Sequence, residues 1–217
     1  MVGLIHPIIP MVTRESALPG RSTPMPVLGP HVVLGTSLTG PWPEGSEVIY
    51  VAMGCFWGAE RLMWQLPGVV VTAAGYMGGW TQNPTYEETC TSLTGHTETV
   101  QVVFNPAQLS LDTILATFWE NHDPTTLNRQ GGDIGTQYRS AIFATSPAQL
   151  EAARASAARY QERLTAQGFG TITTQICGVA DAGDGQFYYA EDYHQGYLHK
   201  NPNGYCNHGF CQVRYAD

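Results

Sequence analysis

Short apolar runs bounded by turn residues are spaced along most of the chain, and each run predicts a buried strand. Their lengths suit strands better than helices, and several are rich in β-branched residues. We therefore predict strands at Val48–Met53, Val69–Ala74, Glu98–Phe104, Tyr138–Ala144 and Thr171–Ile176.

Three other stretches have the spacing of amphipathic helices. The first follows Gly54 and ends at Pro67–Gly68, so Cys55 lies where a strand gives way to a helix. The second is capped by Ser110, with an apolar face formed by Leu111, Ile114, Leu115, Phe118 and Trp119. The third begins at a capping-box pattern, Ser146 with Gln149, carries Pro147 at its first position and ends near Gly168.

The order of these elements predicts the organisation of the chain. Residues 1–45 are rich in Pro and Gly without sustained periodicity, which indicates an N-terminal arm wrapped on the domain. Residues 46–199 hold the interleaved strands and helices, and residues 200–217 form a loop-rich C-terminal tail. We expect an α+β two-layer sandwich, a ferredoxin-like plait with a mixed β-sheet and helices on one face.

The length of the chain limits the number of domains, and its charge limits the kinds of binding partner that we expect. A chain of 217 residues with 43% hydrophobic composition suits one sizeable domain. The net charge of -8 and the scattered Lys and Arg residues exclude nucleic acid and anionic membranes as expected partners. No apolar run approaches the roughly 20 residues that span a bilayer. We expect a soluble monomer.

Cysteine usage bears on the compartment. Five cysteines is an odd number, which favours reactive or buried thiols in a reducing environment over a fully paired secretory framework. The N-terminus MVGLIHPIIPMVTRES has no basic start, and prolines interrupt its apolar stretch, so it does not resemble an export signal. We expect a cytoplasmic protein.

Cys55 is the strongest candidate for a nucleophile. A thiol attacks as its thiolate, and the amides and dipole at the start of a helix favour that anion. Phe56 and Trp57 directly follow it and offer an apolar wall for a methyl-bearing substrate. From these residues alone, Cys55 is also compatible with an ordinary buried thiol, and the aromatic pair with simple core packing.

Six segments in order resemble the A class of peptide methionine sulfoxide reductases, and the resemblance covers nearly the whole chain from about Pro19. These segments are GCFWGAE at 54–60, GYMGGWTQNPTYEE at 75–88, TGHTETVQVVFNP at 94–106, FWENHDPTT at 118–126, GGDIGTQYRSAIF at 131–143 and YYAEDYHQGYLHKNPNGYC at 188–206.

The resemblance implies a site and an activity, the reduction of methionine S-sulfoxide, free or in peptides and proteins. By similarity Cys55 attacks sulfur, Phe56 and Trp57 hold the methyl group, and Glu98 protonates the oxygen. Tyr86 and Tyr138 resemble the hydroxyl donors to that oxygen, and Asp133 the residue that orders the site. A carboxylic acid kept neutral by partial burial is chemically suited to the task implied for Glu98.

The resemblance also gives the tail cysteines a role. It implies that Cys206 attacks oxidised Cys55, that Cys211 then takes over the disulfide, and that thioredoxin reduces the exposed Cys206–Cys211 pair. The chain departs from the family here, because only four residues separate the two cysteines where a longer glycine-rich spacer is expected.

Other chemistries remain open from the residues alone. Thiolates and imidazoles could hold zinc in the tail, from Cys206, His208, Cys211, His194 and His199. Cys55 could pair, as in a hydrolase, with His96, His122 or His194. Cys90 and Cys177 are predicted to be buried thiols without function. The Gly-rich segments lack the spacing of phosphate-binding loops, so no nucleotide or other cofactor is expected.

Overall fold

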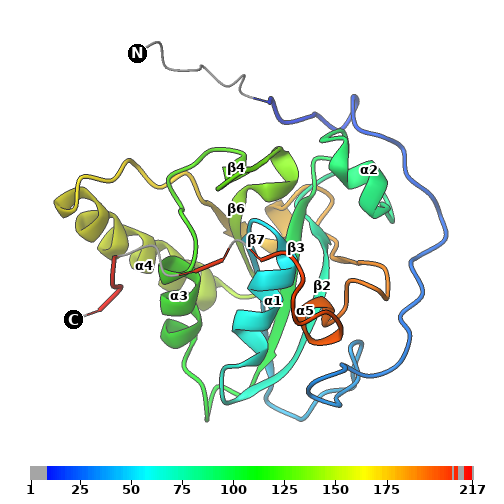
Figure 1. Ribbon diagram of the computed structural model, residues 1–217, viewed down its shortest axis with the longest axis horizontal. Helices are drawn as coiled ribbons and strands as arrows, with labels where there is room; N and C mark the ends of the chain where they lie inside the picture. The colour runs from blue at the N-terminus through cyan, green and yellow to red at the C-terminus, as the bar shows by residue number, and fades with distance from the viewer. Residues whose placement is uncertain (1–8, 207, 210–212, 217) are drawn as a thin grey trace.

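A six-stranded mixed sheet runs through the centre of the computed structural model, and three of its helices lie against one face (Figure 1). The structure describes residues 9–206, 208, 209 and 213–216. The strand order is β7-β6-β1-β3-β2-β8, from β1 (Glu47–Met53), β2 (Val69–Met77), β3 (Thr97–Phe104), β6 (Ser140–Ala144), β7 (Gln175–Gly178) and β8 (Tyr188–Tyr189). Neighbouring strands are antiparallel except β6 and β7, which are parallel.

The remaining elements are helices, short turns and one small hairpin. The helices are α1 (Phe56–Trp64), α2 (Tyr86–Cys90), α3 (Leu111–Glu120), α4 (Pro147–Ala166) and α5 (Tyr197–Lys200). Two 3₁₀ turns, η1 (Thr136–Tyr138) and η2 (Val179–Asp181), flank β6 and β7, and the hairpin pairs β4 (Arg129–Gln130) with β5 (Asp133–Ile134).

Because successive side chains of a strand point to opposite faces, the apolar side chains of the sheet pack on both of its faces. Ile49, Val51 and Met53 of β1 face α1, α3 and α4 in the larger core, where Phe118 and Trp119 are fully buried. The intervening residues face the other side of the sheet. There the arm supplies Leu38 and Trp42, which pack with Val71, Ala73, Val103, Phe187 and Tyr189. Both faces are therefore covered, one by helices and one by the arm and the chain near β8.

Most of the predicted elements are confirmed. Ser110 caps α3 and Ser146 caps α4 through the expected backbone amides. The capping box at Ser146 is only half formed, because the Gln149 carboxamide oxygen accepts from the Thr145 amide instead of closing back on Ser146. A complete box occurs at α2, between Thr85 and Glu88.

The structure differs from the sequence-based expectation in the shorter elements. Tyr138 lies in η1 and not in a strand, and β7 begins four residues later than the predicted start at Thr171. The sequence analysis did not predict α2, α5, β4, β5 or β8, each of which has five residues or fewer. Periodicity is not defined over so few residues.

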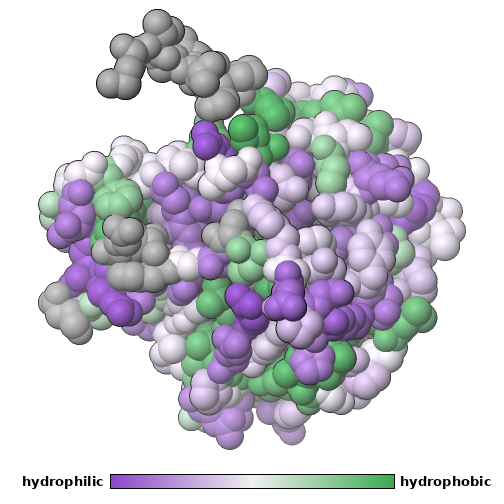
Figure 2. Space-filling view, in the orientation of Figure 1, coloured by the Kyte–Doolittle hydropathy of each residue, from purple (hydrophilic) through white to green (hydrophobic). Residues whose placement is uncertain are grey.

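The surface of the molecule is mostly polar on the face shown in Figure 2, where apolar side chains form only small separate patches. Within the described ranges, no helix combines the length and apolarity that crossing a membrane requires.

Candidate active site

Cys55 stands at the junction that the hydrophobic pattern predicts, directly before α1. Strand β1 ends at Met53, and Gly54 turns the chain with a φ of 90°. A side chain at Gly54 would also collide with Gln130, since a Cβ there would lie 2.6 Å from the Gln130 Cβ. Cys55 then takes the N-cap position of α1 with only 6% of its surface exposed.

Two opposing effects set the pKa of the Cys55 thiol. The amides of Trp57 and Gly58 do lower the pKa of the thiol, as a helix start should. Burial raises the pKa by more, and the nearby charge of Glu98 raises it further. The Cys55 thiol is therefore protonated near neutral pH in this structure.

Glu98 lies directly beneath this helix start. It occupies β3 on the face turned toward the helices, and its Oε2 accepts a hydrogen bond of 2.9 Å from the backbone amide of Phe56. Only 2% of the residue is exposed. Burial raises the pKa of Glu98 to about 8, with the Phe56 amide opposing the shift and the charge of Asp133 adding to it.

Two tyrosines approach the same point from separate segments. Tyr86 is the first residue of α2, and its amide donates to Glu191 Oε1 at 2.8 Å. Tyr138 ends η1. Burial raises the pKa of both phenols, and the charge of Glu98 is the next contribution for each. Both hydroxyls are therefore protonated donors close to the Glu98 carboxyl.

Asp133 joins this group through the tail. It lies on β5 and accepts hydrogen bonds of 3.1 Å at both carboxylate oxygens from the Tyr205 hydroxyl. Its charge also contributes to the raised pKa values of Cys55 and Glu98. The structure thus brings Cys55, Glu98, Tyr86, Tyr138 and Asp133 into one electrostatic cluster.

An aromatic wall completes the site, and it contains two residues that the sequence analysis did not assign to it. The Trp57 ring stacks on Tyr197 at 3.8 Å between centroids. Its Nε1 donates to His194 Nδ1 at 2.9 Å, and His194 also contacts the ring of Phe56 at 4.8 Å. His194 lies three residues before Tyr197, the first residue of the short helix α5, in a part of the chain where no periodicity pointed to either residue.

The C-terminal tail returns to α1. The Arg61 Nη2 lies 3.2 Å from the sulfur of Cys206, and the His208 Nε2 lies 2.7 Å from the backbone oxygen of Met53. Cys206 is therefore placed against the helix that begins at Cys55. Cys211 lies outside the described residues, so its predicted place in the relay stays a prediction.

Comparisons with known proteins agree with this geometry. A family described as peptide methionine sulfoxide reductase matches residues 47–215. The peptide methionine sulfoxide reductase MsrA 1 of Caulobacter vibrioides is 58% identical over 94% of this chain and 92% of its own length. The corresponding MsrA 1 of Synechocystis sp. is 55% identical over 94% of this chain and 89% of its own length. This chain belongs to the peptide methionine sulfoxide reductase family.

Solved structures of the family have the same fold. Methionine sulfoxide reductase A of Corynebacterium diphtheriae superposes with a TM-score of 0.85 at 48% identity, covering 92% of this chain and 94% of the other. Mxr1 of Saccharomyces cerevisiae in reduced form superposes with a TM-score of 0.66 at 36% identity, covering 76% and 91%. The mixed α+β architecture of this reductase is therefore shared with its relatives.

Each of the three histidines considered as a base for Cys55 in a hydrolase-like pair has its acceptor nitrogen engaged elsewhere. His96 is held at both ring nitrogens by backbone, accepting from the Gly79 amide and bonding the Thr81 oxygen. His122 is similarly bonded to the Phe118 oxygen and the Ser140 hydroxyl. His194 already accepts at Nδ1 from Trp57, and burial lowers its pKa to about 3.

The zinc alternative includes Cys211, which lies outside the described residues, and is therefore not tested as a whole. Among the described residues, no three His, Cys, Asp or Glu side chains are grouped so as to hold a metal ion.

The predicted burial of the two remaining thiols was wrong. Cys90 is exposed because it ends the surface helix α2, and Cys177 is half-buried on the edge strand β7.

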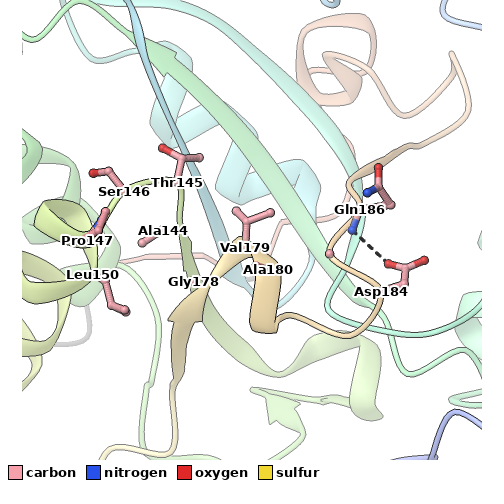
Figure 3. Close-up of a pocket in the computed structure, with 11 residues that line it drawn as sticks. Ala144, Thr145, Ser146, Pro147, Leu150, Gly178, Val179, Ala180, Asp184 and Gln186 are labelled. Carbon is pink, nitrogen blue, oxygen red and sulfur yellow. Dashed lines mark hydrogen bonds between the residues drawn. The ribbon is translucent and has the colours of Figure 1, made fainter.

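A hollow of about 680 Å³ lies elsewhere on the reductase and does not contain the site (Figure 3). It is lined by the β6–α4 junction at Ser146 and Pro147, by Val179, and by the loop at Asp184. The Gln186 amide donates to Asp184 at 3.1 Å along its rim. The size of a hollow therefore does not identify the active site of this protein.

Proposed function

We propose that the chain reduces methionine S-sulfoxide, free or in peptides and proteins, to methionine, with Cys55 as the nucleophile, and so repairs oxidised proteins. The observation that carries the proposal is the pairing of a buried thiol with a carboxyl group that is protonated at neutral pH. Glu98 accepts from the amide of Phe56, the residue next to Cys55, and its pKa of about 8 keeps it an acid there.

The chemistry follows from these two groups. A sulfoxide oxygen is a poor leaving group until it is protonated, and Glu98 supplies that proton. The Cys55 sulfur attacks the sulfoxide sulfur and forms a transient sulfur–sulfur bond. The protonated oxygen then moves to Cys55: a sulfur–oxygen bond forms there, the substrate's sulfur–oxygen bond and the sulfur–sulfur bond break, and methionine leaves with Cys55 as a sulfenic acid. Methionine sulfur is reduced by two electrons and Cys55 is oxidised by two. The thiol proton replaces the one that Glu98 gave, so the step is balanced.

The surrounding side chains account for substrate recognition. Phe56 and Trp57 provide the apolar wall for the methyl group on sulfur, and Tyr197 and His194 fix the orientation of the Trp57 ring. Tyr86 and Tyr138 donate to the sulfoxide oxygen as protonated phenols. Asp133 holds the tail over the site through Tyr205.

Regeneration uses the tail. Cys206 attacks the sulfenic acid of Cys55, Cys211 takes over the disulfide, and thioredoxin reduces the Cys206–Cys211 pair. The position of Cys206 against α1 supports the first exchange. The reaction needs no metal or organic cofactor, and we propose that the enzyme acts as a cytoplasmic monomer.

We also propose that the central strands form a ferredoxin-like plait. Four strands support this fold: they lie in the order β6-β1-β3-β2, all antiparallel, with α1 and α3 as the two crossovers.

We propose the same division of the chain as in the sequence analysis: residues 1–45 form the arm, 46–199 the catalytic domain and 200–217 the tail. Thr81 and Asn83 bond backbone oxygens of the arm at 2.7 and 2.8 Å, which supports docking of the arm beside the site.

The test is methionine release in a single turnover with an S-sulfoxide peptide. Cys55→Ser should release no methionine, because a hydroxyl oxygen is a far weaker nucleophile toward sulfur than a thiol. Cys177→Ser is the matched control, since it removes a half-buried thiol on the edge strand and should release methionine normally. Release by Cys55→Ser would refute the proposed nucleophile.

A further inference from the structure

We propose that Arg61 and His208 prepare Cys206 for its attack on oxidised Cys55, Arg61 by stabilising the thiolate and His208 by accepting its proton. The inference rests on the proposed function, in which Cys206 is the resolving thiol. It assigns positioning roles to one residue of α1 and one residue of the tail.

Arg61 supplies the positive charge at Cys206. It lies on α1, two turns below Cys55, and its Nη2 is 3.2 Å from the Cys206 sulfur. A guanidinium keeps its charge at every pH at which the enzyme works, and its N–H groups donate directly to a sulfur anion. Arg61 therefore places a charged donor on the sulfur and fixes where the sulfur sits.

His208 presents an unused acceptor at the same place. Because its Nε2 lies 2.7 Å from the Met53 backbone oxygen, which only accepts, Nε2 carries the hydrogen and Nδ1 keeps its lone pair. Nδ1 is buried and has no hydrogen-bond partner within the described part of the chain. Buried polar groups are nearly always hydrogen-bonded, so an acceptor without a partner calls for an explanation.

Gly58 brings both groups together over the first turn of α1. A Cβ at this position would lie 2.3 Å from His208 Nδ1 and 2.9 Å from the sulfur of Cys206. The imidazole nitrogen and the sulfur thus share the space that a glycine leaves open. That space is next to Cys55, whose thiol lies near the Gly58 amide.

The proposed step is balanced without an added reductant. The Cys206 proton passes to His208 Nδ1, and the thiolate attacks the sulfur of the Cys55 sulfenic acid. The sulfur–oxygen bond breaks as the disulfide forms, and the departing hydroxide takes the proton held on His208 Nδ1 and leaves as water. Cys55 is reduced and Cys206 is oxidised. Burial lowers the pKa of His208 to about 4, and the charge of Arg61 also lowers it, so the imidazole is neutral before the step and holds the proton only until the hydroxide departs.

The experiment separates this step from methionine formation. Reduced Cys211→Ser enzyme is mixed with one equivalent of sulfoxide peptide, and two rates are recorded: methionine release, and loss of the dimedone-reactive sulfenic acid. Cys206→Ser in the same background gives the reference without disulfide formation. Absence of methionine release from the parent would refute the proposed function instead of this inference.

Two pairs of variants test the roles. Arg61→Met should slow loss of the sulfenic acid at least about tenfold while methionine release continues, and Arg61→Lys should restore most of the rate because it keeps the charge. His208→Gln keeps a donor for the Met53 oxygen and lacks the Nδ1 acceptor, so it should also slow the step about tenfold. Unchanged rates would overturn the proposal. Equal losses in both rates would overturn it too, because the residues would then support α1 as a whole.

Discussion

The Glu98 carboxyl shows how one residue acquires a function from its surroundings. At the start of an exposed strand it would be an ordinary ionised side chain. Here β3 is buried along its whole length, and the carboxyl faces the first turn of α1. Loss of solvation raises its pKa from 4.5 to about 8, which makes it an acid at neutral pH.

The raised pKa predicts a pH profile for the reduction step. Below about pH 8 Glu98 holds its proton and methionine release should be fast, and above that pH the rate should fall as the carboxyl ionises. The Cys55 thiol is protonated throughout this range and gives up its proton only within the reduction step, so it adds no limb of its own. Glu98→Gln should slow release by about 10²-fold and give a flat profile. Single-turnover release measured across the range checks both, and a falling limb that persists in Glu98→Gln would assign the titration to another group.

For single residues, the sequence predicted where the candidate nucleophile lies but not which side chains contact it. The strand-to-helix transition at Cys55 was readable from apolar spacing, while the roles of Glu98 and Tyr138 came only from resemblance to a family. Sheet register and burial, neither of which is encoded locally, decide that Glu98 meets the Phe56 amide and stays protonated. Tyr197 was not singled out, and His194 was considered only as a metal ligand or a base, because their segment has no periodicity that indicates an aromatic wall.

Helix α2 is the element that presents Tyr86 to the site. It has only five residues, too few to be stable through its own hydrogen bonds. The Thr85 side chain accepts from the Glu88 amide at 3.1 Å, and the Glu88 carboxylate accepts from the Thr85 amide at 2.8 Å. This capping box, readable in the sequence as TYEE, is the signal by which α2 could have been predicted.

Loss of the cap should therefore affect catalysis as well as stability. Thr85→Ala should lower the free energy of unfolding by about 1 kcal/mol and slow methionine release, because Tyr86 is the first residue of the helix it caps. Ser110→Ala is the matched control: it removes the cap of α3 at a similar cost and should leave release unchanged. Urea unfolding and single-turnover release measure the two quantities. Equal effects of both variants on release would show that α2 has no special role.

The whole molecule depends on its N-terminal arm for part of its interior. His31 of the arm is 1% exposed, accepts at Nδ1 from the amides of Val33 and Leu34, and lies at Nε2 3.0 Å from the Thr72 hydroxyl. The buried carboxylate of Glu60 lies 3.5 Å from the same nitrogen. Its other oxygen accepts from the Gly196 amide at 2.9 Å, which connects the arm to the segment that carries His194.

His31→Ala tests this connection. The variant leaves Glu60 and Thr72 short of a partner inside the protein, so the free energy of unfolding should fall by about 2 to 3 kcal/mol. Val33→Ala changes an exposed neighbour on the same arm and should cost under about 0.5 kcal/mol. The denaturation midpoint in urea distinguishes the two. A His31→Ala midpoint equal to that of Val33→Ala would show that the arm adds nothing to the interior.

The long elements of the fold were predictable, and the arm's contacts were not. Helices α3 and α4 have a serine cap and many turns, so spacing and end signals agree. The arm has no such pattern. Its position depends on single long-range contacts such as His31 with Thr72, which no local rule specifies.

The central claim is that this chain reduces the S epimer of methionine sulfoxide through Cys55. Its most direct test is an assay of the purified enzyme with each epimer of a methionine sulfoxide peptide, using dithiothreitol as reductant so that the tail relay is not limiting. We predict that the S epimer is converted to methionine and the R epimer is not. Failure to reduce either epimer would contradict the account.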